Sequence, residues 1–227
     1  MPVHRLTRQV AFPDPSLAEP DGLLAVGGDL SPERLVAAYA LGIFPWFSDG
    51  TPILWWSPDP RLVLLPTELH VPRSLARTLR RGAFTFTADR AFEEVMRRCA
   101  EVPRPGQDGT WITDGMVQAY VRLHRLGLAH SFEAWEGATL AGGLYGVSLG
   151  SAFFGESMFS ARPDASKAAF VRSIAWLAGR GVDLVDCQVR TDHLVRFGAR
   201  EVPRPEFLER LAAALERPTL RGPWVLG

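Results

Sequence analysis

The sequence predicts a mixed α/β protein of the α+β kind, with a largely antiparallel sheet. Helical patterns alternate with a short strand between residues 72 and 99, and three consecutive strand patterns separated by turns follow a further helix. Another helix and strand come after them. Strands that follow one another through tight turns pair antiparallel, so helices flanking an antiparallel sheet are the expected arrangement.

Length and composition narrow the class of protein. The 227 residues suffice for one large domain or two unequal ones. Basic and acidic residues number 25 each, so any contact with nucleic acid needs a local patch. The two cysteines are too few for a disulfide framework and suit a reducing compartment. No apolar run approaches the ~20 residues of a membrane helix, and the start lacks the apolar stretch of a secretory signal. We therefore expect a cytoplasmic protein with no membrane partner.

The first helix is predicted from its ends. Ser31 is a suitable N-cap, and Pro32 and Glu33 follow it in the first helical turn. Gly42 is expected to end this helix just after Leu41.

The next segment, GIFPWFSDGTPILWWSPDPR at residues 42–61, combines large aromatic residues with four prolines. Proline blocks helix interiors and central strands, so much of the segment is expected to be rigid loop. Core packing is the more frequent role for any one Trp, but one or two could form a platform for a flat ligand. Composition becomes periodic after this segment. We therefore predict a small N-terminal domain at residues 1–61 and a second domain at residues 62–227.

Hydrophobic periodicity and capping residues define the elements of the second domain. Thr113 is expected to cap one helix and Gly127 to end it. Strands are predicted at 62–65, 84–87, 131–135, 140–147, 152–158 and 184–189, and helices at 72–81, 90–99, 113–126, 166–177 and 205–216.

Several catalytic signatures are absent from the sequence. It contains no G-x-G-x-x-G, P-loop or G-x-S-x-G motif, and no Cys or His pairs with metal-ligand spacing. These absences argue against hydride transfer, phosphoryl transfer and metal-dependent hydrolysis.

The clearest candidate for chemistry is LVDCQVRTDH at residues 184–193. Strand alternation would place Asp186 and Gln188 on one face and Cys187 on the other. A carboxylate and an amide inside a strand need partners, so a structural hydrogen-bonded pair and a functional site stay equally open. With no His evidently paired to it, Cys187 is interpreted as a core thiol.

Three other features could bind a ligand. Glu156 lies among apolar residues and could hold a cation or an amine, although pairing with an Arg is the more frequent case. Trp111 precedes a capped helix N-terminus, which favours an anionic or polar ligand. The helix at 72–81 is either a solvated basic face or a phosphate patch. Its arginines are Arg73, Arg77, Arg80 and Arg81.

Taken together, these segments resemble the leucyl/phenylalanyl-tRNA–protein transferases. The resemblance extends from Phe12 to about Pro203 and rests on long motifs. They are GLLAVGGDLSPERL (22–35), GIFPWFSDGTPILWWSPDPR (42–61), GTWITDGMVQAYVRLHRLGLAHS (109–131), GGLYGVSLG (142–150), FFGESMFS (153–160), DASKAA (164–169) and DCQVRTDH (186–193).

The resemblance implies a fold and a reaction. A small N-terminal domain would accompany a catalytic domain similar to the N-acetyltransferases. Leu or Phe, and less readily Met, would move from aminoacyl-tRNA to the α-amine of proteins that begin with Arg or Lys, marking them for N-end-rule degradation. The enzyme would be a cytoplasmic monomer without metal or other cofactor. The donor is already an activated ester, so the site mainly has to position the amine and accept its proton.

The resemblance also implies roles for individual residues. Gln188 would accept a hydrogen bond from the amine while Asp186 holds its NH₂ group. Relatives often carry Asn in place of Thr191, beside this catalytic strand. The arginine helix would contact tRNA phosphates. Residues around the terminal adenosine and aminoacyl group would be Trp46, Trp111 and Glu156, with Leu144, Phe153, Phe170 and Val185 as the side-chain pocket.

Two alternatives of other kinds stay open. The first is an acyl-CoA-dependent N-acyltransferase, although the connection SMFSARPDASK lacks the glycine that usually helps such enzymes bind pyrophosphate. The second is a non-catalytic module that binds tRNA or a peptide. Such a module would have no need for the polar strand residues Asp186 and Gln188.

Overall fold

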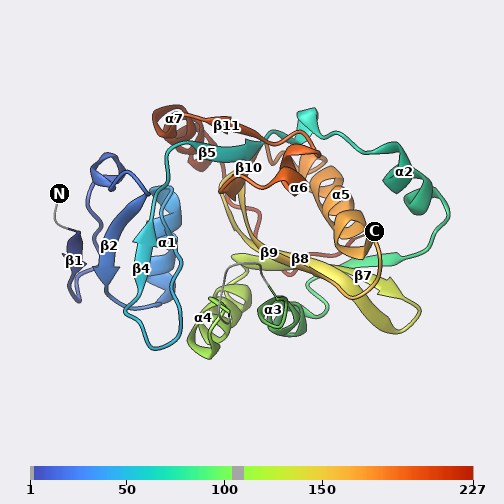
Figure 1. Ribbon diagram of the computed structural model, residues 1–227, viewed down its shortest axis with the longest axis horizontal. Coiled ribbons are helices and arrows are strands. Elements are labelled where there is room, and N and C mark those ends of the chain that lie inside the picture. The colour runs from blue at the N-terminus through green and yellow to red at the C-terminus, as the bar shows by residue number, and fades with distance from the viewer. Residues whose placement is uncertain (1–2, 104–109, 227) are drawn as a thin grey trace.

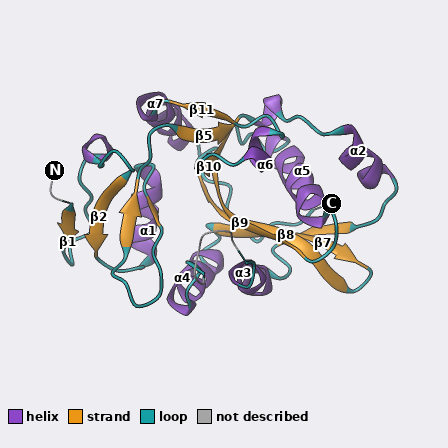
Figure 2. Ribbon diagram, in the orientation of Figure 1, coloured by secondary structure: helices purple, strands orange, loops and turns teal. Residues whose placement is uncertain are grey.

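The computed structural model describes residues 3–103 and 110–226, so the first residue of the motif at 109–131 lies outside it. Two sheets are visible in the described residues, a small one near the N-terminus and a larger one beyond it (Figures 1 and 2). This arrangement confirms a mixed α/β protein. The boundary proposed between residues 61 and 62 falls at the first strand of the larger sheet and stays a prediction.

The small sheet has the strand order β1-β2-β4-β3. Its strands are β1 (His4–Leu6), β2 (Leu23–Gly27), β4 (Leu54–Trp56) and β3 (Phe44–Pro45). The aromatic segment contains β3, β4 and the first residue of the next strand, while its other residues lie outside helices and strands. The expectation that much of it is loop is therefore confirmed. Pro45 is tolerated because β3 is an edge strand of only two residues.

Helix α1 (Pro32–Ala40) begins and ends where the sequence predicted. The Ser31 hydroxyl accepts a hydrogen bond from the Arg34 backbone N–H, which satisfies one of the free donors of the first turn. Its buried residues include Leu35, Ala38 and Tyr39.

The larger sheet has the order β11-β5-β10-β9-β8-β7-β6. All neighbouring strands in it are antiparallel except β9 and β10, so the largely antiparallel prediction is confirmed. The strands are β5 (Arg61–Leu64), β6 (Thr85–Ala88), β7 (Ala129–Glu136), β8 (Thr139–Leu149), β9 (Ala152–Ser160), β10 (Leu184–Gln188) and β11 (Arg200–Val202).

Helices cover both faces of this sheet. Figure 1 shows α3 (Phe92–Ala100) and α4 (Asp114–Arg125) on one face and α5 (Ala165–Ala178) on the other. Helix α5 approaches very closely at Gly142, where a Cβ atom would lie 2.8 Å from the Ser166 nitrogen. A glycine at this position is therefore needed for close packing.

The remaining helices are α2 (Arg73–Arg80), α6 (Asp192–Val195) and α7 (Arg204–Leu215). The longer predicted helices and strands match observed ones to within a few residues, whereas the sequence analysis missed β1, β2, β3, β4, α6 and β11. Each of these elements has only two to five residues, too few for a clear periodic pattern. Within residues 3–103 and 110–226, no helix has the length and apolar character needed to cross a membrane.

Candidate functional site

A pocket of about 460 Å³ lies where strands β9 and β10 separate. The two parallel strands pair only at their beginnings, where residues 152–154 face residues 184–186. Beyond that point β9 continues alongside β8, while β10 stays with β5. Residues on both strands just after the separation, including Gly155, Cys187 and Gln188, line the pocket.

Each diverging strand carries a β-bulge at this point. On β9, Ser157 pairs with Tyr145 and Gly155 with Gly146, so Glu156 is an extra residue. On β10, Cys187 is the extra residue, between the partners of Val63 and Leu62 on β5. A bulge redirects side chains and commonly lies beside a functional site. Both bulged residues line the pocket.

The pocket gathers nearly all the side chains that the sequence analysis selected. Of the proposed catalytic and donor-binding residues, only Asp186 is absent from its lining. The residues that line it are Trp46, Trp111, Leu144, Phe153, Glu156, Phe170, Val185, Gln188 and Thr191. Their roles stay predictions, although their common location supports them.

Asp186 lies behind the pocket wall and is fully buried. Its two carboxylate oxygens accept hydrogen bonds from Arg61, at 2.8 Å from Nε and 2.7 Å from Nη2. One of them also accepts from the Gln188 backbone N–H at 2.9 Å. The buried Arg61 is enclosed by Phe44 and Phe207, whose ring centroids lie 4.9 and 4.6 Å from its guanidinium carbon.

This arrangement corrects two expectations. Asp186 and Gln188 do not share a face of the strand, because the bulge at Cys187 breaks the alternation. Asp186 also does not hold the side-chain amide of Gln188; it holds the backbone amide. Gln188 has φ of 59°, a left-handed conformation that non-glycine residues rarely adopt. Such strained residues cluster at functional sites, and here the Asp186 contact helps to maintain the conformation.

The Gln188 side chain is oriented by Glu156. Its Nε2 donates a hydrogen bond to Glu156 Oε1 at 3.1 Å. Because the NH₂ end of the amide is engaged in this way, the carbonyl end is the part that can accept a hydrogen bond from a substrate.

Glu156 is surrounded by neutral donors. Tyr39 donates to Oε1 at 2.7 Å and Tyr120 to Oε2 at 3.2 Å, and the two tyrosine hydroxyls also contact each other. Burial raises the pKa of Glu156, and the charge of Asp186 adds to this increase. The hydrogen bonds from the tyrosines and Gln188 lower the pKa, and the result of all these contributions is about 7. An Arg was the more frequent partner expected for this carboxylate, but no Arg is among the described residues that shift the pKa of Glu156.

Some residues of the site were not selected from the sequence. Tyr39 and Tyr120 are completely buried residues of α1 and α4. Arg61 could have been expected, since a buried Asp186 requires a partner. Burial also raises the pKa of Tyr39 and Tyr120 well above the usual tyrosine value, with the Glu156 charge adding to the shift, so both stay protonated donors.

Burial also shifts the pKa values of two further pocket residues. Burial raises the pKa of Cys187, and the neighbouring Asp186 charge adds to this, so the thiol stays protonated at neutral pH. The protonated thiol agrees with the prediction that Cys187 is a core thiol, although this residue also lines the pocket. Burial lowers the pKa of His193, as do the positive charges of Lys167 and Arg196.

Aromatic residues of the N-terminal part form one wall. Trp46 lines the pocket, whereas Trp55 is completely buried and donates its indole N–H to the Gly27 carbonyl at 2.9 Å. Trp56 donates to the Trp46 carbonyl at 2.7 Å and thereby supports that residue. Thr191 lines the mouth of the pocket while its hydroxyl caps α6 by accepting from the Leu194 backbone N–H.

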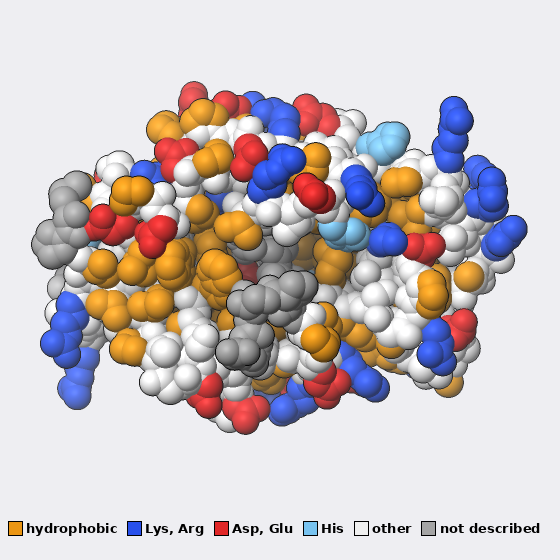
Figure 3. All heavy atoms as spheres, viewed as in Figure 1, with side chains coloured by type: hydrophobic (Ala, Val, Ile, Leu, Met, Phe, Trp, Pro, Cys, Tyr) orange, Lys and Arg blue, Asp and Glu red, His pale blue; other side chains and the backbone are white. Residues whose placement is uncertain are grey.

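The arginines of α2 are remote from the pocket lining. All four are exposed, and within the described part of the chain none has a carboxylate oxygen within 4 Å; they are Arg73, Arg77, Arg80 and Arg81. Figure 3 shows Lys and Arg side chains gathered at the end of the molecule where Figure 1 places α2. The patch is therefore free to contact an anionic partner.

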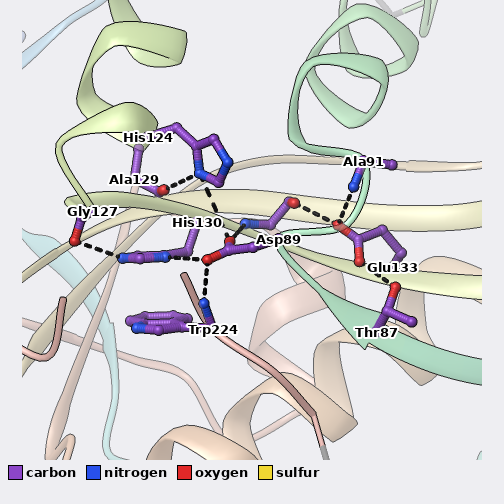
Figure 4. A network of polar contacts seen from close by, with 10 residues as sticks. Thr87, Asp89, Ala91, His124, Gly127, Ala129, His130, Glu133 and Trp224 are labelled. Carbon is purple, nitrogen blue, oxygen red and sulfur yellow. Dashed lines mark hydrogen bonds and ion pairs between the residues drawn. The ribbon is translucent and has the colours of Figure 1, made fainter. Parts of the chain in front are cut away.

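A second polar cluster lies between β6, β7 and α4 (Figure 4). Asp89, His124 and His130 offer atoms within 4.8 Å of one another, a spacing that could suit a metal ion. However, His124 Nδ1 donates to the Ala129 carbonyl at 2.8 Å. His130 places Nδ1 2.9 Å from Asp89 Oδ2 and Nε2 3.2 Å from the Gly127 carbonyl oxygen, so protein groups engage both of its ring nitrogens.

This cluster holds the C-terminal segment against the sheet. The Trp224 backbone N–H donates to Asp89 at 2.6 Å, and its indole ring stacks on His130 with a centroid separation of 3.4 Å (Figure 4). Trp224 also packs near Phe153, a residue of the pocket wall. The cluster therefore supports the C-terminal segment.

Comparison with known proteins decides the family. The model of the leucyl/phenylalanyl-tRNA protein transferase family matches residues 63–212, and the model of its N-terminal domain matches residues 28–59. The chain belongs to the leucyl/phenylalanyl-tRNA–protein transferase family. Transferases of this name from Anaeromyxobacter sp. (strain K) and Myxococcus xanthus (strain DK1622) are 77% and 58% identical to it. Both alignments cover 100% of this chain, with 97% of the first relative and 98% of the second.

The solved structures of two proteins resemble this chain more distantly. A functionally unknown conserved protein from Staphylococcus epidermidis matches with a TM-score of 0.45 and 9% identity, covering 80% of this chain and 68% of its own. A protein described as L-PGS from Bacillus licheniformis matches with a TM-score of 0.40 and 10% identity, covering 74% and 54%.

Proposed function

We propose that this protein transfers Leu or Phe, and less readily Met, from aminoacyl-tRNA to the α-amine of proteins that begin with Arg or Lys. The reaction is direct aminolysis of the tRNA ester, and its product is marked for degradation by the N-end rule. We further propose that it acts in the cytoplasm as a monomer. The observation that carries the proposal is the pocket at the β9/β10 separation, which combines apolar walls with the oriented amide of Gln188.

The pocket suits an amino acid with an apolar side chain. Leu144, Phe153, Phe170 and Val185 contribute aliphatic and aromatic surface, and the aromatic Trp46 and Trp111 stand at the same pocket. Sites for small ligands are typically lined in this way, with few polar groups that fix orientation. Aromatic side chains can also stack on a terminal nucleobase.

The polar end of the pocket suits an amine acceptor. Free α-amines have a pKa near ~8, so a useful neutral fraction exists at neutral pH. The free carbonyl oxygen of the Gln188 amide can accept a hydrogen bond from this amine and orient it toward an ester carbonyl. We propose that Asp186 acts indirectly, by holding the backbone of Gln188.

The start of α5 argues against acyl-CoA as the donor. The backbone N–H of Ala165 donates to the Arg162 carbonyl at 3.1 Å, and that of Ser166 donates to the Ser160 hydroxyl at 3.2 Å. The Asp164 carboxylate also lies at this helix end, paired with Lys167 at 2.8 Å. A pyrophosphate would find these donors occupied and a negative charge beside them.

The test is a transfer assay with purified protein. Labelled leucyl-tRNA or phenylalanyl-tRNA is supplied with a peptide that begins with Arg or Lys, and labelled peptide is the expected product. Matched controls are the same peptide with an acetylated N-terminus and leucyl-CoA in place of leucyl-tRNA. We expect no product in either control.

The alternatives give different results in the same assay. Transfer from leucyl-CoA without tRNA would establish the acyl-CoA-dependent enzyme. Binding of tRNA or peptide without any product would establish the non-catalytic module. Either result would contradict the proposed function.

A further inference from the structure

We propose that Glu156, together with Tyr39 and Tyr120, is the proton acceptor of the transfer reaction. This inference rests on the proposed function and adds a catalytic residue to it. It assigns Glu156 a part in the chemistry beyond the donor-binding role that the family resemblance implies.

The first observation is the place of Glu156. It is the bulged residue of β9, at the point where the sheet opens, and its side chain contributes to the pocket surface. It also contacts Gln188, the residue that we expect to orient the amine, at 3.1 Å. A proton acceptor has to lie within hydrogen-bond reach of the group that loses the proton, and an amine held by the Gln188 side chain would lie beside Glu156.

The second observation is the hydrogen count around the carboxylate. Three contacts join the groups in a ring: Tyr39 to Tyr120, Tyr39 to Oε1 of Glu156, and Tyr120 to Oε2. Each contact requires one hydrogen, but the two phenols supply only two. Both phenol hydrogens are donated to the carboxylate when Glu156 is ionised, and the ring can also accommodate a proton on Glu156.

The third observation is the absence of a fixed positive charge. Among the described residues, the groups that shift the pKa of Glu156 are the two tyrosines, Gln188 and the buried Asp186. Cys187 and His193 line the same pocket. Since Arg61 is engaged by Asp186, no cation in the described part of the chain pairs with Glu156. The pKa of about 7 that results agrees with a group that exchanges protons near neutral pH.

The two carboxylate oxygens of Glu156 differ in their hydrogen-bond partners. Oε1 accepts hydrogen bonds from both Tyr39 and Gln188. Oε2 accepts from Tyr120 alone among the described residues, so it retains a lone pair for an ammonium N–H. The tyrosines are completely buried and do not themselves line the pocket.

The proton balance of the reaction follows. The α-ammonium group of the acceptor protein gives one proton to Glu156, and the amine lone pair then attacks the ester carbonyl to form the C–N bond. The C–O bond to the ribose breaks as the carbonyl re-forms, and the second proton on nitrogen passes to the ribose oxygen. Glu156 finally releases its proton to solvent, so the products are an amide, a hydroxyl group and one proton.

The main test compares Glu156→Gln with the unaltered protein in single-turnover transfer between pH 5.5 and 9. Removing a general base typically slows a reaction ~10²–10⁴-fold, and we expect a loss in this range at pH 7. Glu156→Asp retains a carboxylate and should recover part of the rate. The matched control is Glu136→Gln, which alters an exposed carboxylate on β7 that is paired with Arg162.

Tyr39→Phe tests the pH dependence of the transfer rate, which would not change if Glu156 had only a structural role. The Tyr39 hydrogen bond favours the ionised form of Glu156, so its removal should raise the pKa. Because only ionised Glu156 accepts a proton, the acidic limb of the rate profile should move to higher pH. An unchanged profile in Tyr39→Phe, or full activity in Glu156→Gln, would overturn the proposal.

A measurement independent of transfer separates this inference from the proposed function. Carbon-13 NMR of the glutamate carboxylates should show one resonance that titrates near neutral pH and is missing in Glu156→Gln. Absence of transfer by the unaltered protein would refute the proposed function, whereas a Glu156 that stays ionised down to pH 5 would refute the proton acceptor alone.

Discussion

At the scale of single residues, the site depends on the different surroundings of Asp186 and Glu156. Asp186 is fully buried against Arg61, and this ion pair supports the backbone of the neighbouring Gln188. Among the described residues, Glu156 has only neutral hydrogen-bond donors. One carboxylate is therefore paired with a cation, and the other is the proposed proton acceptor.

These surroundings predict different effects for neighbouring substitutions. Asp186→Ala should abolish turnover and also lower stability, because breaking a buried ion pair costs about 3–5 kcal/mol when one charge is left unpaired. Gln188→Ala should lower kcat by about 10² with little loss of stability, since only a pocket hydrogen bond is removed. The measurements are kcat and the midpoint of denaturant unfolding.

Affinity for tRNA completes this comparison. Asp186 does not line the pocket, so the folded fraction of Asp186→Ala should bind tRNA nearly as well as the unaltered protein. Full turnover in this variant would show that the Asp186 contact is unnecessary for the reaction.

At the scale of elements, the decisive feature is the separation of two parallel strands. β9 and β10 pair over their first residues and then part, and each has a bulge where the separation begins. Gly146 makes the β9 bulge possible, because a Cβ atom there would lie 2.3 Å from the Phe154 carbonyl oxygen. The helices on both faces hold the open sheet in place (Figure 2).

Helix α2 carries a prediction of its own. Exposed arginines without acidic partners should contact tRNA phosphates, so Arg77→Ala with Arg80→Ala should weaken tRNA binding. Each lost phosphate contact should reduce the slope of log affinity against log salt by about 0.7–0.9. A filter-binding titration at several salt concentrations measures both quantities.

Helix α3 offers the matched control. Arg97 and Arg98 are also surface arginines, but they pair with Glu93 and Glu94 one turn earlier. Substituting both by Ala should leave tRNA affinity and its salt slope unchanged. If the α2 and α3 variants lose tRNA affinity equally, general surface charge, and not the α2 patch, attracts the tRNA.

At the scale of the whole molecule, both sheets contribute to one site. Phe44 and Trp46 reach the pocket from the small sheet, and Tyr39 reaches Glu156 from α1. Gln188 and Glu156 come from the larger sheet. The N-terminal part therefore completes the pocket wall as well as covering the sheet.

Two tryptophans of the same segment test this arrangement. Trp46→Ala should weaken use of the aminoacyl-tRNA donor, because a pocket wall is lost, while thermal stability changes little. Trp55→Ala should instead lower stability by about 3–5 kcal/mol, since its side chain is completely buried. Steady-state kinetics and thermal unfolding of both variants make the comparison. A large stability loss in Trp46→Ala with unchanged kinetics would show that this residue is structural.

The amino-acid sequence by itself determined the fold class, the longer elements and most residues of the pocket. Capping residues such as Ser31 and Thr113 act on neighbouring backbone groups, and hydrophobic periodicity reports which faces are buried, so both can be recognised locally. The pocket residues Trp46, Glu156 and Gln188 were found through long motifs.

Only the tertiary structure decided how these residues are connected. Asp186 meets Arg61 across 125 positions of sequence, and Glu156 meets Tyr39 across 117. Strand alternation predicted the wrong face for Asp186, because a bulge is defined by the pairing of two strands and not by one strand's residues. The partners of a buried carboxylate, and therefore its proton affinity, follow from packing between distant segments.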